Sequence, residues 1–450
     1  MGQTQPPIQP QERRITNLHE VNLGYGKKQN LEESRRCPQC AEPSCLSGCP
    51  LGIDIPGFIR LLREDDTSSA LERIKEQNPF PAICGRICPA PCERACIFFE
   101  DGAPIAIRAL ERYASDFGKL KPIKLSPVMQ GKRVAVIGSG PSGMSAAFYL
   151  AKAGFGVTIF EAMDEPGGLL RYGVPEFRLP QKILDEQFNE LASLGVKIET
   201  NVFVGRTESI LNVFNQGFVA VLLTVGAGLP EFIDFPGHDL GGVYYAEEFL
   251  LRVQMFNKTK TQDAARKLFL GDQTVVIGSG YSALDSARLA RRMGQEVALI
   301  FGGLEEELGV RGDDLELAVE EGVKLLTPVR PERIDGDAQG FAKSVQGSRL
   351  EVVEEKEQLE LKEIQDGQIV QEAQTVILSH GRVPNLFLSK HLPQLQCSKE
   401  GAIETDKSTG LTSVDRIFAA GNVVTGAGPV VDAIANGKRV AVQIKEFLSK

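Results

Sequence analysis

Residues 134–161 read VAVIGSGPSGMSAAFYLAKAGFGVTIFE, and this stretch decides the fold. It begins as an apolar strand, passes through a glycine-rich turn, continues as an amphipathic helix and ends in a second apolar strand. That order is the start of a dinucleotide-binding unit. Residues 274–301, TVVIGSGYSALDSARLARRMGQEVALIF, repeat it and align without a gap. One GxGxxG motif is weak support, but two copies in the same strand–turn–helix setting predict two such units.

The first unit carries every feature that a bound dinucleotide requires. Gly138 permits a tight turn at positive φ, Gly140 lets the backbone approach a pyrophosphate, and Gly143 lets the helix pack closely on the strand. The N-terminus of that helix offers free N–H groups and a favourable dipole to the phosphates. Glu161 ends the second strand, where a carboxylate can accept hydrogen bonds from an adenosine ribose. We therefore assign the tightly held cofactor to this unit.

The second unit keeps the turn but not the carboxylate. Its turn residues are Gly278, Gly280 and Ala283, and alanine is an accepted third residue. Phe301 stands where the first unit has its glutamate. Two interpretations stay open: the unit binds a nicotinamide nucleotide, or its fold persists and it binds nucleotide poorly.

The cysteines are concentrated near the N-terminus. Eight of the nine lie between Cys37 and Cys96, and only Cys397 lies outside. They form two runs, which read Cys37-x2-Cys40-x4-Cys45-x3-Cys49-Pro50 and Cys84-x3-Cys88-Pro89-x2-Cys92-x3-Cys96. Thiolate runs with Cys-Pro resemble ferredoxin-type spacing, in which one cysteine of a run often serves the other cluster. Zinc is the competing interpretation. A disulfide framework is disfavoured because we expect a cytoplasmic protein, and thiols stay reduced in that compartment.

The bulk composition is that of a globular protein of 450 residues, with 42% hydrophobic and 24% charged residues. A net charge of −9 argues against a general nucleic-acid or anionic-membrane binder. The chain has no apolar run long enough to span a membrane and no apolar segment of a secretory signal near its start. We expect a cytoplasmic protein, with no nucleic-acid partner and no membrane insertion.

We predict an α/β fold in which an α-helical domain precedes two Rossmann-like domains. The helical domain covers residues 1–125 and binds the clusters. The first Rossmann-like domain comprises residues 126–250 and 386–450, because a short strand and a final helix at the C-terminus return to it. The second comprises residues 251–385.

Six segments carry a family resemblance. They are CPQCAEPSCLSGCPLGIDIPGFI (37–59), NPFPAICGRICPAPCERACI (78–97), APIAIRALERY (103–113), EPGGLLRYGVPEFRLP (165–180), TVGAGLP (224–230) and GPVVDAIANGKRVA (428–441). They resemble the glutamate synthase small-subunit family, which includes the N-terminal half of dihydropyrimidine dehydrogenase and the large subunit of NADH-dependent ferredoxin:NADP oxidoreductase. The resemblance covers about residues 31–450.

The resemblance implies a glutathione-reductase-like pair of domains with FAD in the first and NAD(P)H in the second. It also implies two 4Fe–4S clusters. The ligands of one are Cys37, Cys40, Cys45 and Cys96, and those of the other are Cys49, Cys88, Cys92 and Glu111. Cys84 is left over as a small buried residue. Further flavin contacts are implied at Gly167, Gly168, Arg178, Gly421, Asn422, Gly428, Pro429 and Val430.

The chain departs from the family at its second unit, where the family carries an arginine pair for the 2′-phosphate of NADPH. Gly302 and Gly303 stand at those places, and Tyr281 replaces the usual asparagine. We therefore predict a preference for NADH, which Arg311 would reverse if it folded back to this site. Asn422 replaces the usual aspartate near the flavin ribityl chain.

The predicted function is that of an NAD(P)H-dependent oxidoreductase subunit. It passes electrons between nucleotide, FAD and the clusters to a protein partner, which is a large synthase-like subunit or a ferredoxin-type protein. The alternative is an electron-transfer subunit of a larger complex with a degraded nucleotide site. Since the chemistry belongs to the cofactors, we predict no catalytic acid or base. We expect no amidotransferase domain in this chain and therefore no synthesis of glutamate by the chain alone.

Overall fold

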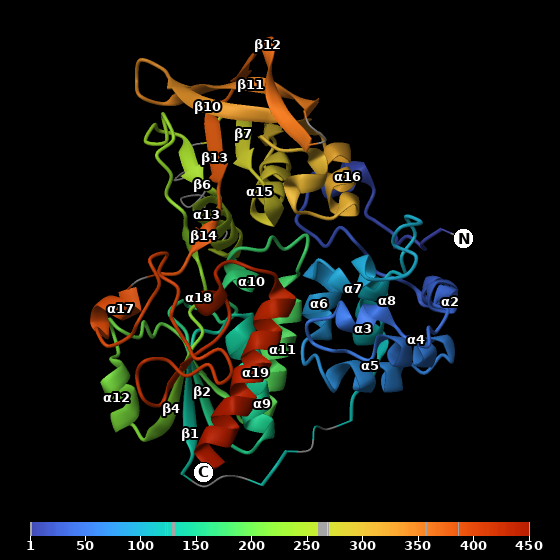
Figure 1. Ribbon diagram of the computed structural model, residues 1–450, viewed down its shortest axis with the longest axis vertical. Coiled ribbons are helices and arrows are strands. Elements are labelled where there is room, and N and C mark those ends of the chain that lie inside the picture. Colours follow the sequence, from blue (N-terminus) through green and yellow to red (C-terminus); the bar gives the residue numbers. More distant parts are fainter. Residues whose placement is uncertain are drawn as a thin grey trace.

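The computed structural model describes residues 2–121, 123, 125–127, 131–259, 268, 270–355, 358–385 and 387–449. In Figure 1, short helices of the N-terminal part lie beside one sheet, and a second sheet lies above the first. No helix among the described residues is long and apolar enough to cross a membrane.

The N-terminal part is helical because its apolar residues recur every three or four positions between proline and glycine breaks. The helices are α1 (Gln11–Arg14), α2 (Lys27–Arg36), α3 (Ser44–Ser47), α4 (Ile55–Arg63), α5 (Thr67–Lys75), α6 (Pro81–Ile87), α7 (Pro91–Arg94) and α8 (Ile107–Phe117). In α4, Ile55, Phe58, Ile59 and Leu62 are all buried, as their spacing predicts.

The first sheet is parallel, with strand order β15-β4-β1-β2-β3. Its strands are β1 (Arg133–Ile137), β2 (Gly156–Phe160), β3 (Lys197–Glu199), β4 (Phe218–Leu223) and β15 (Ile417–Ala419). The helices of this unit are α9 (Pro141–Lys152), α10 (Leu169–Tyr172), α11 (Gln181–Ser193), α12 (Ile210–Asn215), α17 (Phe387–His391), α18 (Asn422–Thr425) and α19 (Val430–Ser449). The C-terminal strand and helix lie against this unit, since β15 pairs with β4 and the Ser145 hydroxyl of α9 donates to the Ile434 carbonyl oxygen of α19 at 2.8 Å.

The second sheet is also parallel, with strand order β6-β13-β7-β8-β9. Its strands are β6 (Val243–Tyr245), β7 (Gln273–Gly278), β8 (Glu296–Ile300), β9 (Val323–Leu326) and β13 (Thr375–Ser379). Its helices are α13 (Ala246–Thr259), α15 (Gly280–Arg292), the 3-10 helix η1 (Glu305–Leu308) and α16 (Gly312–Glu320). The predicted boundary at residue 250 would assign β6 to the first unit, although β6 pairs with β13; the domain division stays a prediction.

Two smaller sheets complete the fold. An antiparallel sheet of β10 (Val329–Gly336), β11 (Ala342–Glu355) and β12 (Gln358–Glu372) covers the far end of the second unit, at the top of Figure 1. A two-stranded sheet of β5 (Leu229–Pro230) and β14 (Arg382–Val383) lies where the chain passes between the two units.

The helical part and the first unit share one hydrophobic core. Phe80, before α6, packs edge-on against Phe148 of α9, with ring centroids 6.2 Å apart. The Tyr149 hydroxyl donates to the Gln77 carbonyl oxygen at 2.8 Å. This shared core fixes the cysteine-bearing helices next to α9 and α19.

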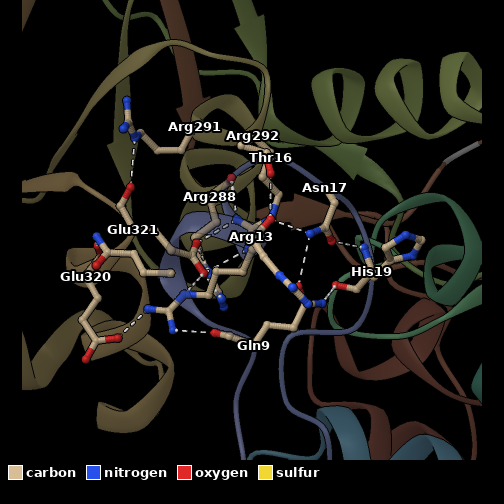
Figure 2. A network of polar contacts seen from close by, with 12 residues as sticks. Gln9, Arg13, Thr16, Asn17, His19, Arg288, Arg291, Arg292, Glu320 and Glu321 are labelled. Carbon is tan, nitrogen blue, oxygen red and sulfur yellow. Dashed lines mark hydrogen bonds and ion pairs between the residues drawn. The ribbon is translucent and has the colours of Figure 1, made fainter.

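The N-terminal segment crosses to the second unit and is held there by buried charge. Arg14 is 4% exposed, and its Nε lies 3.2 Å from Glu321 Oε1. The buried Glu321 also pairs with Arg288 and Arg292 of α15, at 2.7 Å in each case. Figure 2 shows Glu321 facing these two arginines, with Arg13 of the N-terminal segment beside them. One carboxylate thus joins three guanidinium groups from two distant parts of the chain.

Candidate functional site

The first glycine-rich turn, between β1 and α9, has the open geometry that the sequence predicts. Gly138 has φ +103°, which L side chains rarely adopt, and a Cβ there would lie 2.7 Å from the Thr224 carbonyl oxygen. A Cβ at Gly143 would overlap the Gly138 carbonyl oxygen, so glycine is what lets α9 approach the turn. A Cβ at Gly140 would meet nothing within 4 Å. This open position leaves room for a phosphate against the start of α9.

Glu161 follows β2 and lies against the same turn, with 6% of its surface exposed. Its Oε2 accepts hydrogen bonds from the Ser139 N–H at 3.0 Å and from the Ser139 hydroxyl. The Gly167 N–H donates to the Ser139 hydroxyl oxygen at 2.8 Å, and a Cβ at Gly168 would lie 3.2 Å from the Gly140 Cα. The structure therefore brings Glu161 and the two later glycines to the first turn; their cofactor contacts stay predictions.

The C-terminal segment places the start of α19 near this turn. Gly421 has φ +78°, and a Cβ there would lie 2.7 Å from the Ser142 side chain of α9. The Asn422 amide donates to the Gly428 carbonyl oxygen at 3.3 Å, which closes the loop before α19. The remaining predicted flavin contacts on this segment follow at Pro429 and Val430.

The second turn, between β7 and α15, has the same shape as the first. Gly278 has φ +134°, and a Cβ there would overlap the Ser379 carbonyl oxygen. A Cβ at Gly280 would meet nothing within 4 Å, and Ala283 is fully buried against the sheet. This turn therefore also leaves its second position open for a phosphate.

Tyr281, in the first turn of α15, belongs to a partly buried cluster of polar and charged side chains next to the second glycine-rich turn. Its ring centroid lies 4.1 Å from the Arg178 guanidinium carbon, and its hydroxyl donates to Asp314 Oδ2 at 2.8 Å. Arg178 Nη1 also donates to Asp285 Oδ2 at 2.7 Å. Burial alone would raise the pKa of Asp314, but Arg178 and Arg108 outweigh it and lower the pKa to about 2. Arg178 is thus engaged with the second unit, and its flavin contact stays a prediction.

The end of β8 is where the ribose of a nucleotide would lie in this unit. A Cβ at Gly302 would have its nearest neighbours at 3.8 Å, whereas a Cβ at Gly303 would lie 2.7 Å from the Phe301 ring. Arg311 points elsewhere, because it donates to Glu93 Oε2 at 2.7 Å and to Asp313 Oδ1 at 3.0 Å. The cation that could have reversed the predicted preference for NADH is therefore paired with carboxylates.

The N-terminal cysteines surround two neighbouring cavities in the helical part. The outer cavity is lined by Cys37, Cys40, Cys45 and Cys96. The inner cavity is lined by Cys49, Cys84, Cys88, Cys92 and Glu111. Ile55 and Ile107 line both cavities. Within the described ranges, no three His, Cys, Asp or Glu side chains converge on one point as ligands of a single ion would.

Comparison with known proteins identifies the family. The family model "dihydropyrimidine dehydrogenase domain II, 4Fe-4S cluster" matches residues 14–122, and "pyridine nucleotide-disulphide oxidoreductase" matches residues 132–437. The small chain of NADPH glutamate synthase from Azospirillum brasilense is 31% identical, over 99% of this chain and 95% of that protein. The chain belongs to the glutamate synthase small-chain family.

Two other known proteins resemble this chain over different shares of their length. The β subunit of NADP⁺-dependent formate dehydrogenase from Moorella thermoacetica is 30% identical, over 90% of this chain and 60% of that protein. The solved structure of FprA from Mycobacterium tuberculosis in complex with NADPH has a TM-score of 0.57 at 18% identity, covering 72% of this chain and 85% of that one. This second likeness concerns the fold alone.

As a glutamate synthase small-chain family member, this protein is an oxidoreductase. The matched models and relatives support FAD, iron–sulfur and nicotinamide cofactors, and the predicted α/β fold with a helical iron–sulfur part is confirmed. All nine cysteines are free.

The donors of the inner cavity fit an iron–sulfur cluster by their chemistry. Burial raises the pKa of Cys88 to about 12 and the pKa of Cys92 well above its usual value. Burial also raises the pKa of Glu111 to about 8. The apolar walls oppose negative charge on these groups, and bound iron would supply the compensating positive charge.

Two residues of the inner cavity were not predicted as part of the site. Asn78 lines the cavity and donates from Nδ2 to Glu111 Oε1 at 2.7 Å. Cys84 lies in the same wall, although the sequence resemblance left it over. Cysteine spacing carries no signal for Asn78, because a neutral amide before a proline is common in ordinary turns.

Proposed function

We propose that this chain takes electrons from a nicotinamide nucleotide and delivers them to a partner protein through FAD and two 4Fe–4S clusters. When bound, the flavin accepts a hydride and the clusters carry single electrons. The observation that carries the proposal is the position of Val431. It lines the inner cysteine cavity and directly follows the predicted flavin contact Val430.

The chain's own residues hold and order these groups. The first turn and Glu161 would hold the dinucleotide, and the start of α19 would stabilise negative charge on a reduced flavin through its dipole. The inner cavity lies next to α19, and its wall residues Ile55 and Ile107 also line the outer cavity. Electrons would therefore pass from the flavin to the cluster of the inner cavity and then to the cluster of the outer cavity.

The outer cavity is the side from which a partner would accept electrons. Three of its four cysteines are half-buried and only Cys37 is buried, whereas three of the four inner cysteines are buried and only Cys49 is half-buried. The partner is a large synthase-like subunit or a ferredoxin-type protein, in keeping with relatives named as chains of glutamate synthase and of formate dehydrogenase. We place the chain in the cytoplasm, where free thiols are kept reduced.

A second candidate function is an electron-transfer subunit whose nucleotide site is degraded. The observation in its favour is that Phe301 and two glycines occupy the end of β8. Anaerobic mixing with NADH or NADPH separates the two. Bleaching of the flavin followed by reduction of the clusters supports our proposal, and an unchanged flavin spectrum with both nucleotides at millimolar concentration supports the degraded site.

A further inference from the structure

The inner cavity holds one donor more than a cluster needs. A 4Fe–4S cluster takes one protein ligand on each iron. The donor side chains that line the cavity are Cys49, Cys84, Cys88, Cys92 and Glu111. The predicted ligand set includes Glu111 and leaves out Cys84, although Cys84 is only 1% exposed and lies in the cavity wall.

A close helix crossing brings Cys84 and Glu111 together. Helices α6 and α8 meet at Gly85, where a Cβ would lie 2.6 Å from the Arg112 Cα. Each ligand candidate is the residue immediately before its contact position, and both side chains line the cavity. The N–H of Cys88, the C-cap of α6, donates to the Cys84 carbonyl oxygen at 3.0 Å, so these cysteines lie one turn apart.

Asn78 lines the same cavity as the two competing ligand side chains, Cys84 and Glu111. It is fully buried, and its Oδ1 accepts the Phe80 N–H at 3.0 Å, which fixes the direction of the amide. Its Nδ2 donates to Glu111 Oε1 at 2.7 Å.

We propose that Asn78 selects the fourth ligand of the inner cluster and that Cys84 is a reserve ligand. The hydrogen bond to Oε1 would leave Oε2 of Glu111 to bind an iron, and Cys84 would remain a thiol. When the carboxylate is removed, the S–H bond of Cys84 breaks, its proton passes to water, and its sulfur binds the iron. No electron is transferred in this exchange. The inference rests on the proposed two-cluster function.

Four forms of the full chain, reconstituted anaerobically with iron and sulfide, test the exchange: the parent, Glu111→Ala, Cys84→Ser and Glu111→Ala/Cys84→Ser. We expect about eight irons per chain in the first three forms and about four in the double variant. The EPR signal and midpoint potential of the inner cluster should change in Glu111→Ala, where thiolate replaces carboxylate, and stay unchanged in Cys84→Ser.

Equal iron contents in Glu111→Ala and the double variant would overturn the exchange. About four irons in the parent would instead overturn the two-cluster proposal and this inference with it. Asn78→Ala provides an independent arm, since it leaves both donors in place. We expect it to keep its iron but to shift the inner EPR signal toward that of Glu111→Ala, and an unchanged signal would contradict the role of Asn78. Far-UV circular dichroism and bound flavin report whether each variant is folded.

Discussion

Arg311 of the second unit donates a hydrogen bond to Glu93 of the helical part at 2.7 Å, and Glu93 directly follows Cys92 in the chain. Glu93 is 3% exposed, and its other oxygen accepts the Arg108 N–H at 2.8 Å. A charged contact thus joins the second unit to a residue next to a predicted cluster ligand.

Replacing Arg311 with alanine should leave the buried Glu93 carboxylate without its main partner. We expect a loss of about 3 kcal/mol in the free energy of unfolding, because breaking a buried ion pair strands one charge. Urea unfolding followed by circular dichroism measures it. Arg333→Ala is the matched control, since Arg333 and Asp335 form an exposed pair, and it should cost under about 1 kcal/mol. Equal losses in the two variants would contradict the importance of burial.

Glu321→Gln should destabilise the chain more than Glu320→Gln does. Glu321 is buried and balances Arg14, Arg288 and Arg292, so its removal should cost about 3–5 kcal/mol. The Glu320 side chain is 60% exposed, so its pair with Arg14 should contribute about 1 kcal/mol or less. Urea unfolding of both variants compares them, and equal midpoints would count against the account.

The same comparison predicts a pH dependence. Burial alone would raise the pKa of Glu321, but hydrogen bonds from Arg288 and Arg292 outweigh it and lower the pKa. A carboxyl whose folded pKa is lowered stabilises the fold above its unfolded pKa of about 4.3, and the stabilisation is lost as the pH falls through the folded value. The stability difference between the parent and Glu321→Gln should therefore be full at pH 7 and should shrink below about pH 4. A constant difference from pH 7 to pH 3 would contradict this origin.

Gly302→Arg should improve the use of NADPH. In the parent chain, NADH should reduce the flavin faster than NADPH does. Glu305, Glu306 and Glu307 of η1 follow the two glycines, and their negative charge would repel the 2′-phosphate of NADPH. A Cβ at Gly302 is free of close neighbours, so an arginine there can reach the 2′-phosphate. A charge-assisted hydrogen bond of about 1.5 kcal/mol corresponds to about a tenfold gain with NADPH. Stopped-flow flavin reduction measures it, and faster reduction of the parent by NADPH than by NADH would refute the preference.

Cys40→Ala and Cys88→Ala should each remove one cluster. Cys40 lines the outer cavity and Cys88 the inner one. Each variant should lose about half of the iron. Thermal unfolding should begin at a lower temperature, because cluster binding by these cysteines contributes to the folding of the helical part. Full iron content and normal melting in Cys40→Ala, or in Cys88→Ala made together with Cys84→Ser, would show that the ligand assignment is wrong.

The fold was predictable where local patterns repeat. Both glycine-rich turns and the helix α4 follow directly from spacing, since each pattern reflects a backbone or packing need within a few residues. The antiparallel sheet β10–β12 was not predicted, because its strands are long, charged and separated from any motif. The docking of Arg14 was also missed, since its partner Glu321 lies far along the chain.

The site was predictable in part for the same reason. The cysteine runs indicate cluster chemistry, and the resemblance divides them into the two groups that line the two cavities. The place of Asn78 depends on how α6 crosses α8 at Gly85, which spacing along one chain does not reveal. The pairing of Arg178 with Asp285 likewise depends on how the two units face each other.

Iron, acid-labile sulfide and flavin measured together on the anaerobically purified chain test the central claim most directly. Two 4Fe–4S clusters and one FAD predict about eight irons, about eight sulfides and one flavin per chain. Zinc in place of iron, or about four irons per flavin, would contradict the account.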